Sequence, residues 1–297
     1  MKLASAYLTV ILIWSTTPLA MKWSTESLGF TEAAGLRTLI GALVCALLLL
    51  ARRVSIPLHR TACLSYASAV LGVFGAMLCA FWAVQFIPSG LVSVMFGLAP
   101  LFSGLFAWPL LGERALGRLR LLGVLVAFGG LATVFRSDIG QLAGGLPGIV
   151  AAVSGTVLFS LSSVLVKRTS TGIDAIAHTT ASLWLSLPLF AAAWWLFDGT
   201  PPTEITARSL GAVLYLGVFA STIGFVVFLF VLRRLTAARV ALIPLLTPVI
   251  ALSLGAALAG EALAASTLLG AGLILLGLFV YEFGGRFSSR SRARAVT

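Results

Sequence analysis

The sequence predicts an all-α polytopic membrane protein with ten transmembrane helices in two inverted five-helix repeats. Three observations support this prediction. Of the 297 residues, 60% are hydrophobic and only 10% are charged, against about 25% charged residues in an ordinary soluble domain. Apolar stretches long enough to cross a bilayer follow one another along the whole chain. The second half of the chain also repeats residues of the first half in the same order.

A helix needs about 20 mainly apolar residues to span the hydrocarbon core of a bilayer. Ten stretches meet this condition, at residues 4–23, 32–51, 64–86, 89–111, 117–136, 146–167, 175–197, 209–232, 236–259 and 265–284. The connections between them are short, and none is long enough to form a soluble domain. Gly, Pro and Ser inside several spans fit this prediction where neighbouring helices satisfy the freed backbone groups.

The basic residues predict which side of the membrane each connection faces, because cytoplasmic connections are enriched in Lys and Arg. With the N-terminus in the cytoplasm, the opposite side holds only Lys22, Arg136 and Arg208, and Arg37 lies within the second span. The cytoplasmic ends hold the remaining basic residues: Lys2, Arg52, Arg53, Arg60, Arg114, Arg118, Arg120, Lys167, Arg168, Arg233, Arg234, Arg239, Arg286, Arg290, Arg292 and Arg294. We therefore expect a multi-pass protein of the inner or plasma membrane with both termini cytoplasmic. The net charge of +11 then reflects topology, and no nucleic-acid partner is expected.

An internal repeat divides the spans into two groups of five. At offsets of 145 to 148 residues, it pairs Trp14-Ser15 with Phe159-Ser160, Lys22 with Lys167, Leu71-Gly72-Val73-Phe74 with Leu216-Gly217-Val218-Phe219, Pro100 with Pro248, Gly112-Glu113 with Gly260-Glu261, and Gly123 and Gly130 with Gly270 and Gly277. An odd number of spans in each repeat forces the two halves into opposite orientations. We assign residues 1–140 to the first repeat, 141–285 to the second, and 286–297 to a basic cytoplasmic tail that meets anionic lipid head groups.

Inverted repeats favour a secondary transporter, because two similar halves can exchange inward-open and outward-open shapes around a site at the membrane midplane. A duplication kept for packing alone is the alternative. A channel is less favoured, since no filter-like segment or ring-forming acidic segment is found in the sequence. No ATP-binding motif is present either, so the solute gradient, exchange or ion coupling must supply the energy.

The sequence offers little support for an enzyme, a cofactor or a metal site. Only two histidines occur, His59 and His178, and no catalytic motif such as H-E-x-x-H or G-x-S-x-G is found. No carboxylate lies deep in a predicted span. Cys45, Cys63 and Cys79 form no C-x-x-C pair, which favours a packing role for them over a disulfide framework.

The ordered motifs of both halves resemble the EamA-type branch of the drug/metabolite transporter (DMT) superfamily. The residues that carry the resemblance are Trp14-Ser15, Arg37, Phe81-Trp82-Ala83-Val84-Gln85-Phe86-Ile87, Pro100, Gly112-Glu113-Arg114, Arg233-Arg234-Leu235, Arg239, Pro248 and Gly260-Glu261. The resemblance implies a central cavity lined by helices 1, 3, 4, 6, 8 and 9. It also implies movement of small organic solutes, often the export of metabolites or amino acids. Two positions depart from the pattern: Ala262 follows Glu261, and Gln85 stands where a basic residue is common.

Aromatic and hydroxyl side chains on the predicted cavity helices are the candidates for substrate binding. Hydroxyls donate or accept hydrogen bonds, and aromatic rings offer a stacking surface. The candidates are Trp14, Ser15, Thr17, Phe81, Trp82, Gln85, Phe96, Pro100, Phe159, Ser160, Ser163, Phe225, Phe228, Thr247 and Pro248. For the serines, helix packing is an equal alternative. For Pro100 and Pro248, a structural kink is the favoured role.

The charged residues near span ends have structural interpretations at this stage. For Arg37, snorkelling to the outer interface or pairing with Glu32 is favoured over binding an anionic group of the substrate. Lys22 and Lys167 are expected to be interfacial anchors. Glu113 and Glu261 are expected to stabilise their loops by pairing with basic residues across a short turn, with gating as the alternative.

The function predicted from the sequence is a secondary transporter, most simply an exporter, of a small organic solute such as an amino acid, an amine or another metabolite. Alternating access around a central cavity is the expected mechanism. The expected partners are the small-molecule substrate and membrane lipid, in a monomer or a homodimer, without a cofactor or metal. A flippase for a lipid-linked carrier and a non-transporting membrane scaffold are the alternatives.

Overall fold

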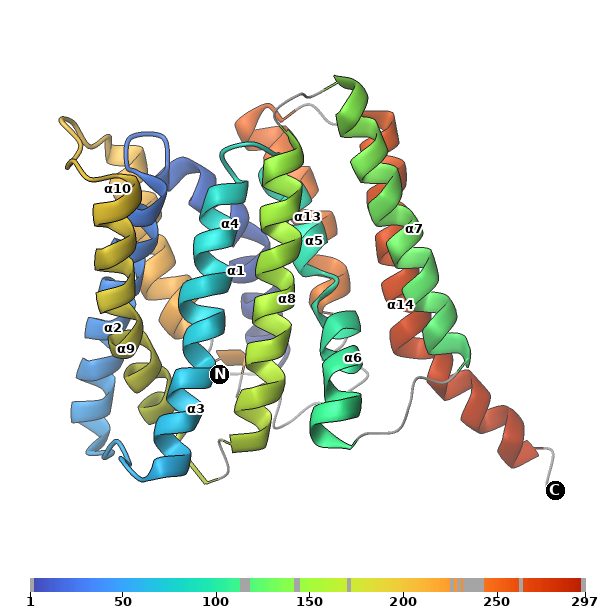
Figure 1. Ribbon diagram of the computed structural model, residues 1–297, viewed down its shortest axis with the longest axis horizontal. Coiled ribbons are helices and arrows are strands. Elements are labelled where there is room, and N and C mark those ends of the chain that lie inside the picture. Colours follow the sequence, from blue (N-terminus) through green and yellow to red (C-terminus); the bar gives the residue numbers. More distant parts are fainter. Residues whose placement is uncertain are drawn as a thin grey trace.

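The computed structural model describes residues 3–112, 118–141, 145–169, 172–224, 227–228, 231, 243–261 and 264–294. Every regular element within these residues is a helix, and the helices stand side by side across the bundle (Figure 1). Successive helices alternate in direction, as a chain that crosses a membrane repeatedly requires. The all-helical fold class is confirmed.

The first repeat contains five spans. They are α1 (Leu3–Ser24); α2 (Phe30–Arg52); α3 (Arg60–Val70), which continues through η1 (Leu71–Ala76) into α4 (Met77–Ala83); α5 (Ser89–Phe96) followed by α6 (Ala99–Leu111); and α7 (Arg118–Gln141). The second repeat contains α8 (Gly145–Thr169), α9 (Ala175–Phe197), α10 (Ala207–Tyr215) with η2 (Leu216–Ile223), α13 (Ile243–Ala259) and α14 (Ala265–Arg294).

These helices account for the ten predicted spans. Within the described part of the chain, seven helical stretches are long and apolar enough to cross a membrane, and shorter apolar helices at 119–134, 207–223 and 245–259 occupy the other three positions. The backbone of α14 continues as helix through Arg294, so the first part of the predicted basic tail extends this helix.

The two repeats are inverted relative to one another. Helix α6 ends at Gly112 and α13 ends at Gly260, and the ends of these two helices lie on opposite faces of the bundle (Figure 1). Both glycines have a positive φ, 65° and 61°, the left-handed conformation that commonly terminates a helix. We call the face at the end of α13 the outer face and the face at the end of α6 the inner face, following the predicted orientation.

One apolar core joins the two repeats. Among its buried side chains, Phe81 and Met95 come from the first repeat, whereas Ile149, Phe190 and Leu216 come from the second. Because the halves share this core, they do not pack as separate domains. Large apolar side chains are also exposed on the outward surfaces of many helices, which is the surface that lipid covers in a membrane protein.

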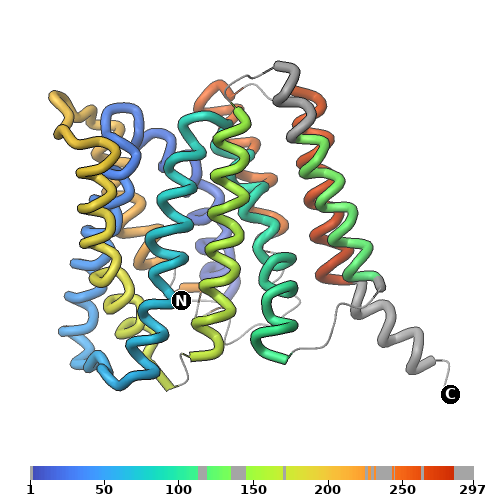
Figure 2. The backbone as a smooth tube through the Cα atoms, viewed as in Figure 1, coloured from blue at the N-terminus to red at the C-terminus, as the bar shows by residue number. Residues whose placement is uncertain are grey.

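Helices α7 and α14 pack against each other as an antiparallel pair at one end of the bundle (Figure 2). Their contact is formed by the repeated glycines. A Cβ on Gly130 would lie 2.6 Å from the carbonyl oxygen of Gly270, and a Cβ on Gly123 would lie 2.6 Å from that of Gly277. Small residues let helix backbones approach closely in membranes, so this repeated motif positions the last helix of each half.

We therefore expect Gly130→Ala to lower the free energy of unfolding by about 1–3 kcal/mol, since the added methyl group must force the two backbones apart. Gly129→Ala is the matched control. A Cβ at Gly129 meets nothing within 4 Å, so this change should be neutral or slightly stabilising through helix propensity. Thermal unfolding in detergent compares the two variants, and equal losses would contradict the assigned contact.

Candidate functional site

A carboxylate bridges the two repeats at the outer face. Glu261, between α13 and α14, accepts hydrogen bonds from Lys22 Nζ at 2.8 Å and from the backbone N–H of Ser89 at 2.9 Å, both to Oε1. The Ser89 hydroxyl donates to Oε2 at 3.2 Å. Lys22 lies at the end of α1 and Ser89 begins α5, so both partners belong to the first repeat. We call these three residues the outer network.

The outer network stabilises the ionised form of Glu261. Its side chain is only 3% exposed, whereas that of Lys22 is 35% exposed. Burial by itself would raise the pKa of Glu261. The hydrogen bonds from Lys22 and Ser89, together with the charge of Lys22, outweigh burial and hold the pKa below its ordinary value of 4.5. The position at the N-terminal end of α5 also favours a negative charge.

A second carboxylate joins the repeats at the same face. Asp198, which follows α9, accepts hydrogen bonds from the backbone N–H groups of Thr31 and Glu32, each at 3.1 Å, and from the Thr31 hydroxyl. It therefore caps the first turn of α2 from the other repeat. With the outer network, this cap ties the outer ends of both halves together.

The fourth span is interrupted near its middle. Helix α5 ends at Phe96 and α6 begins at Ala99, with Pro100 in the first turn of α6, where a proline removes no needed hydrogen bond. The Ala99 carbonyl accepts a hydrogen bond from Ser160 Oγ of α8 at 3.1 Å. A Cβ on Gly97 would lie 3.5 Å from Pro248 Cγ, so the interruption faces α13 of the other repeat.

The second repeat differs from the first at the corresponding positions. Leu245 and Leu246, which correspond to Gly97 and Leu98, lie within the continuous helix α13. Ser15, which corresponds to Ser160, is fully buried, and its hydroxyl has no hydrogen-bond partner in the structure. In the part of the chain that the structure describes, the helix is therefore interrupted at Gly97 and Leu98 but not at the corresponding Leu245 and Leu246.

The repeated sequence Leu-Gly-Val-Phe forms π-helix in both halves, in η1 and in η2. Such wide turns are rare and occur frequently at functional sites. In η1, a Cβ on Gly72 would lie 2.9 Å from Ser162 Oγ of α8. In η2, a Cβ on Gly217 would lie 2.5 Å from the Ile40 side chain of α2. The π-helical segments thus bring the third span of each repeat against a helix of the other repeat.

Arg37 of α2 points into the bundle beside η2. Its Nε donates to Ser221 Oγ at 3.0 Å, its Nη1 donates to Met77 Sδ at 3.4 Å, and its guanidinium carbon lies 6.0 Å from the centre of the Phe81 ring. Arg37 is 8% exposed. The expectation that Arg37 snorkels outward or pairs with Glu32 is therefore wrong.

Several sequence-predicted candidates meet in pairs across the repeats. The rings of Trp14 and Phe228 have centroids 4.8 Å apart. The rings of Phe96 and Phe159 have centroids 6.3 Å apart, and Ser160 follows in the same turn of α8. Trp14 and Phe159 are themselves related by the repeat, so each half contributes one aromatic side chain to a contact with another span.

Other candidates lie apart from these pairs. The hydroxyls of Thr17 and Ser163 donate to carbonyls of their own helices, at 2.7 and 2.8 Å. Trp82 is 37% exposed and packs on Phe30 and Phe86, and the neighbouring Gln85 is also exposed. Phe81, Thr247 and Pro248 are buried, and Pro100 is half-buried. Phe225 lies outside the described residues.

Sequence reasoning missed the partners in the outer network, because they are far apart in the chain. Lys22 and Glu261 are separated by 239 positions. The available signal was the recurrence of a lysine at the end of the first helix and a Gly-Glu pair after the fourth helix of each repeat. The corresponding Glu113 lies outside the described residues. The role of Asp198 in capping α2 and the contact of Arg37 with Ser221 left no such signal.

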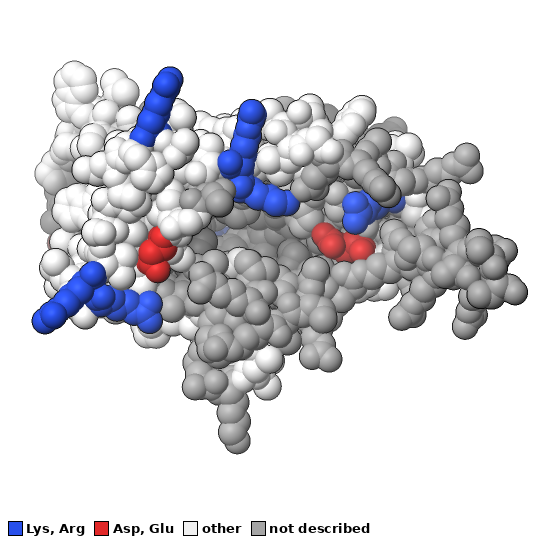
Figure 3. Space-filling model, turned by 90° about the horizontal axis from the view of Figure 1, so that it is seen from below, with Lys and Arg blue, Asp and Glu red and all other residues white. Residues whose placement is uncertain are grey.

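Basic side chains stand around the inner face (Figure 3). Helix ends at this face contribute Arg52, Arg53, Arg60, Arg120, Lys167 and Arg168. These are among the residues from which the cytoplasmic assignment of the inner face was predicted, and that assignment stays a prediction. Within the described residues, no group of three or more His, Cys, Asp or Glu side chains could hold a metal ion.

Comparison with known proteins places both halves in one family. The sequence model of the EamA-like transporter family matches residues 2–136 and residues 146–282. These two matches fall within the two predicted repeats. The chain is 27% identical to the uncharacterized transporter YoaV of Bacillus subtilis over 95% of this chain and 97% of that protein. It is 25% identical to the uncharacterized inner membrane transporter YedA of Escherichia coli, covering 95% and 91% of the two chains.

Two further similarities extend over nearly the whole chain. A Salmonella typhimurium protein named "Probable amino-acid metabolite efflux pump" is 25% identical over 96% of each chain. One solved crystal structure superposes with a TM-score of 0.64 at 25% identity, covering 94% of this chain and 95% of that one. The fold described above is therefore shared with an experimentally determined structure.

Glu261→Gln should lower the free energy of unfolding by about 1–3 kcal/mol at neutral pH, because the amide removes a charged acceptor from a buried cluster. Glu26→Gln is the matched control. Glu26 also pairs across the repeats, with Arg208 at 3.4 Å, but those side chains are 39% and 65% exposed. Exposed pairs contribute about 0–1 kcal/mol, so a loss as large as that of Glu261→Gln would contradict the special role of the outer network.

The contribution of Glu261 to the free energy of unfolding should decrease as the pH falls. Because its pKa is lowered in the folded protein, the contribution is complete above the ordinary value of 4.5 and is lost as the pH falls through the lowered folded value. Melting temperatures of the wild type and Glu261→Gln should therefore differ by a constant amount from pH 6 to pH 8 and converge under stronger acid. A difference that grows on acidification would contradict the ionised state.

Proposed function

We propose, on the premise that this chain belongs to the EamA-like transporter family of the DMT superfamily, that it is a secondary transporter that exports a small organic solute by alternating access. The family and the names of its relatives support a membrane transporter as the class. The solute, the direction and the mechanism are our proposal. The expected orientation, with the inner face in the cytoplasm, is part of it.

One observation carries the mechanism. Within the described residues, repeat-related positions of the fourth and ninth spans differ in conformation. Gly97 and Leu98 separate α5 from α6, and Ser160 binds the Ala99 carbonyl, whereas Leu245 and Leu246 lie within α13 and the Ser15 hydroxyl has no hydrogen-bond partner. In a transporter with inverted repeats, the conformation of each half in one state is adopted by the other half in the opposite state. The difference between the halves supports a protein held in one of two such states.

The outer network supports the assignment of that state. Glu261 and Asp198 join the two repeats at the outer face. A solute that enters from the inner face would then be released outward only after the contacts of Glu261 with Lys22 and Ser89 separate. The half-buried aromatic pairs formed by Trp14 and Phe159 lie between the faces and supply surfaces for the body of the solute.

Linking the outer face should stop transport reversibly. Lys22→Cys and Glu261→Cys would be combined after Cys45, Cys63 and Cys79 are replaced by serine, and joined with a short cleavable bifunctional thiol reagent. We expect solute flux in proteoliposomes to fall to background after linking and to recover after reduction, while each single cysteine variant treated in the same way keeps its flux. Undiminished flux through fully linked protein would contradict opening at this face.

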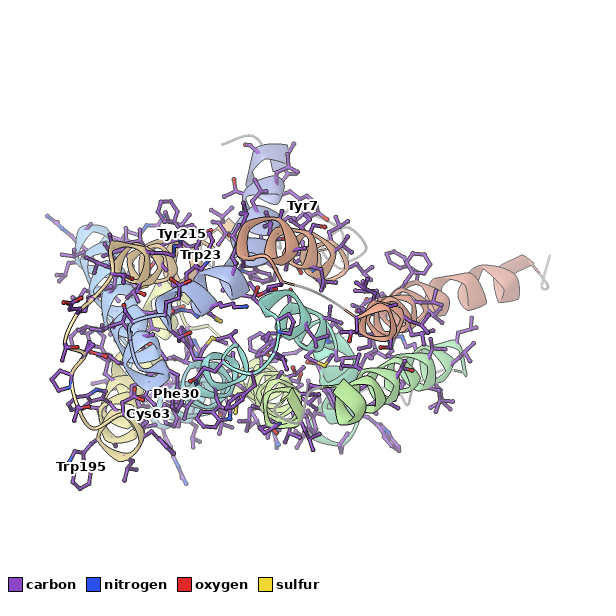
Figure 4. The ribbon with its side chains drawn as sticks, turned by 90° about the horizontal axis from the view of Figure 1, so that it is seen from above. Tyr7, Trp23, Phe30, Cys63, Trp195 and Tyr215 are labelled. Atoms are coloured by element: carbon purple, nitrogen blue, oxygen red, sulfur yellow. The ribbon has the colours of Figure 1, made fainter. Side chains whose placement is uncertain are left out.

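Trp14 should contribute more to solute binding than a lipid-facing tryptophan. Trp195 is 75% exposed and points away from the bundle when seen from the outer face (Figure 4), so Trp195→Ala serves as the control. Solutes that bind the folded form raise its melting temperature. Screening amino acids, amines and organic acids, we expect Trp14→Ala to lose most of any such increase and Trp195→Ala to retain it. An equal loss of the solute-induced increase in melting temperature in both variants would show that Trp14 does not belong to the site.

A further inference from the structure

Arg37 is a charged side chain enclosed by the bundle and lacking an opposite charge. It lies seven residues into α2, which places it about 10 Å along the helix from the outer end. The neighbouring residues on the same helix face, Ala34, Thr38 and Gly41, are buried, so the guanidinium faces the interior and not lipid. In the described part of the chain, no carboxylate oxygen lies within 4.0 Å of it.

The guanidinium of Arg37 has more N–H donors than hydrogen-bond partners among the described residues. Its Nε is bound to Ser221 Oγ, and Nη1 has the thioether of Met77, a weak acceptor. Nη2 makes no hydrogen bond in the described residues. Among the described residues, the completely enclosed polar side-chain atoms without a partner are Ser15 Oγ and Trp194 Nε1, and Nη2 of Arg37 is not one of them. Nη2 is therefore not completely enclosed, although only 8% of the residue is exposed.

An unpaired guanidinium inside a membrane protein is costly, and such groups mark binding sites or ion pathways. Two acidic residues at the outer face are already committed, because Asp198 caps α2 and Glu261 pairs with Lys22. No acidic residue of the whole sequence falls in the middle of a predicted span. The described residues therefore supply no anion to neutralise Arg37, and a ligand can.

The second repeat contains no counterpart to this charge. At the offset of 145 residues, Ser182 of α9 corresponds to Arg37, and its hydroxyl donates to the carbonyl of His178 within the same helix. The two halves thus differ in charge at one related position, as a site that recognises one charged end of an asymmetric solute would require. The half-buried Met77 beside the guanidinium provides an apolar surface for the rest of that solute.

We propose that Arg37 binds the carboxylate of the transported solute, and that the solute is a small organic acid without a compensating positive charge. This inference rests on the proposed transport function and names its substrate class. An amine would place a second cation beside Arg37. A zwitterion would bring an ammonium group to an interior that offers it no carboxylate. A monocarboxylate neutralises the guanidinium and can accept both hydrogens of Nη2.

Matched sets of solutes test the charge requirement. Each set shares one body: 3-phenylpropionate, phenylalanine and 2-phenylethylamine form an aromatic set, and valerate, norvaline and butylamine form an aliphatic set. With purified protein, we expect carboxylates to raise the melting temperature and the corresponding amines to leave it unchanged. The inference is overturned if amines stabilise the protein as well as carboxylates do, or if no carboxylate in the sets binds.

Substitutions of Arg37 separate binding from folding. Arg37→Gln should raise the apparent Kd for the stabilising carboxylate by about ten- to a hundredfold. Arg37→Lys should retain part of the affinity, because it keeps the charge but not the planar fork. Arg208→Gln removes the same charge from the exposed pair with Glu26 and should leave the Kd unchanged. An unchanged Kd in Arg37→Gln would overturn the assignment.

A second measurement does not depend on the stability of Arg37→Gln. In protein whose Cys45, Cys63 and Cys79 are replaced by serine, Arg37→Cys should react with a small water-soluble methanethiosulfonate reagent, and the stabilising carboxylate should slow that reaction. A cysteine that never reacts from either face would contradict an open position for Arg37.

Transport then distinguishes this inference from the proposed function. If amines or neutral solutes are transported and Arg37→Gln does not change their flux, the proposed anionic substrate class is wrong and the transport function stands. Carboxylate binding that needs Arg37, without flux of any solute, would uphold the site and overturn the transport function.

Discussion

A bilayer offers no hydrogen-bond partner to the polar groups of a chain that crosses it, so this bundle must satisfy them from within. Most of the interior polar contacts described here do so by joining one repeat to the other. Glu261 accepts hydrogen bonds from Lys22 and Ser89 at the outer face. The Ser160 hydroxyl donates a hydrogen bond to the Ala99 carbonyl at the interruption of the fourth span. Polar groups therefore determine how the two halves meet, while apolar packing holds them together.

The groups that this constraint leaves unsatisfied are the informative ones. Ser15 has no partner, although its repeat-related counterpart Ser160 is hydrogen-bonded. Arg37 has N–H donors without a hydrogen-bond acceptor among the described residues. The proposed mechanism accounts for the first case by a conformational change in which the halves exchange roles, and the proposed substrate class accounts for the second by a ligand that brings its own negative charge. Both explanations follow from one premise, namely that buried polar groups remain unpaired only where function needs them.

The architecture was predictable from the sequence because apolar length and internal repetition are both local properties of a chain. The predicted span 175–197 coincides with α9, and the repeated glycines of α7 and α14 meet as the duplication suggests. The site was predictable only in part. Trp14 and Phe159 form aromatic contacts, but the direction of Arg37 depends on the π-helical turn that carries Ser221. Such a turn has no simple periodic signature in the sequence.

Spin-label distances between the repeats at both faces test the central claim most directly, namely that the halves exchange conformations about a shared interior. One pair, Thr25 and Ala265, reports on the outer face, and a second pair, Leu111 and Arg168, reports on the inner face. Weakening the outer network with Glu261→Gln should lengthen the outer distance and shorten the inner one in the same population of molecules. An outer distance that lengthens while the inner distance stays fixed would show only a loosened loop and would contradict alternating access.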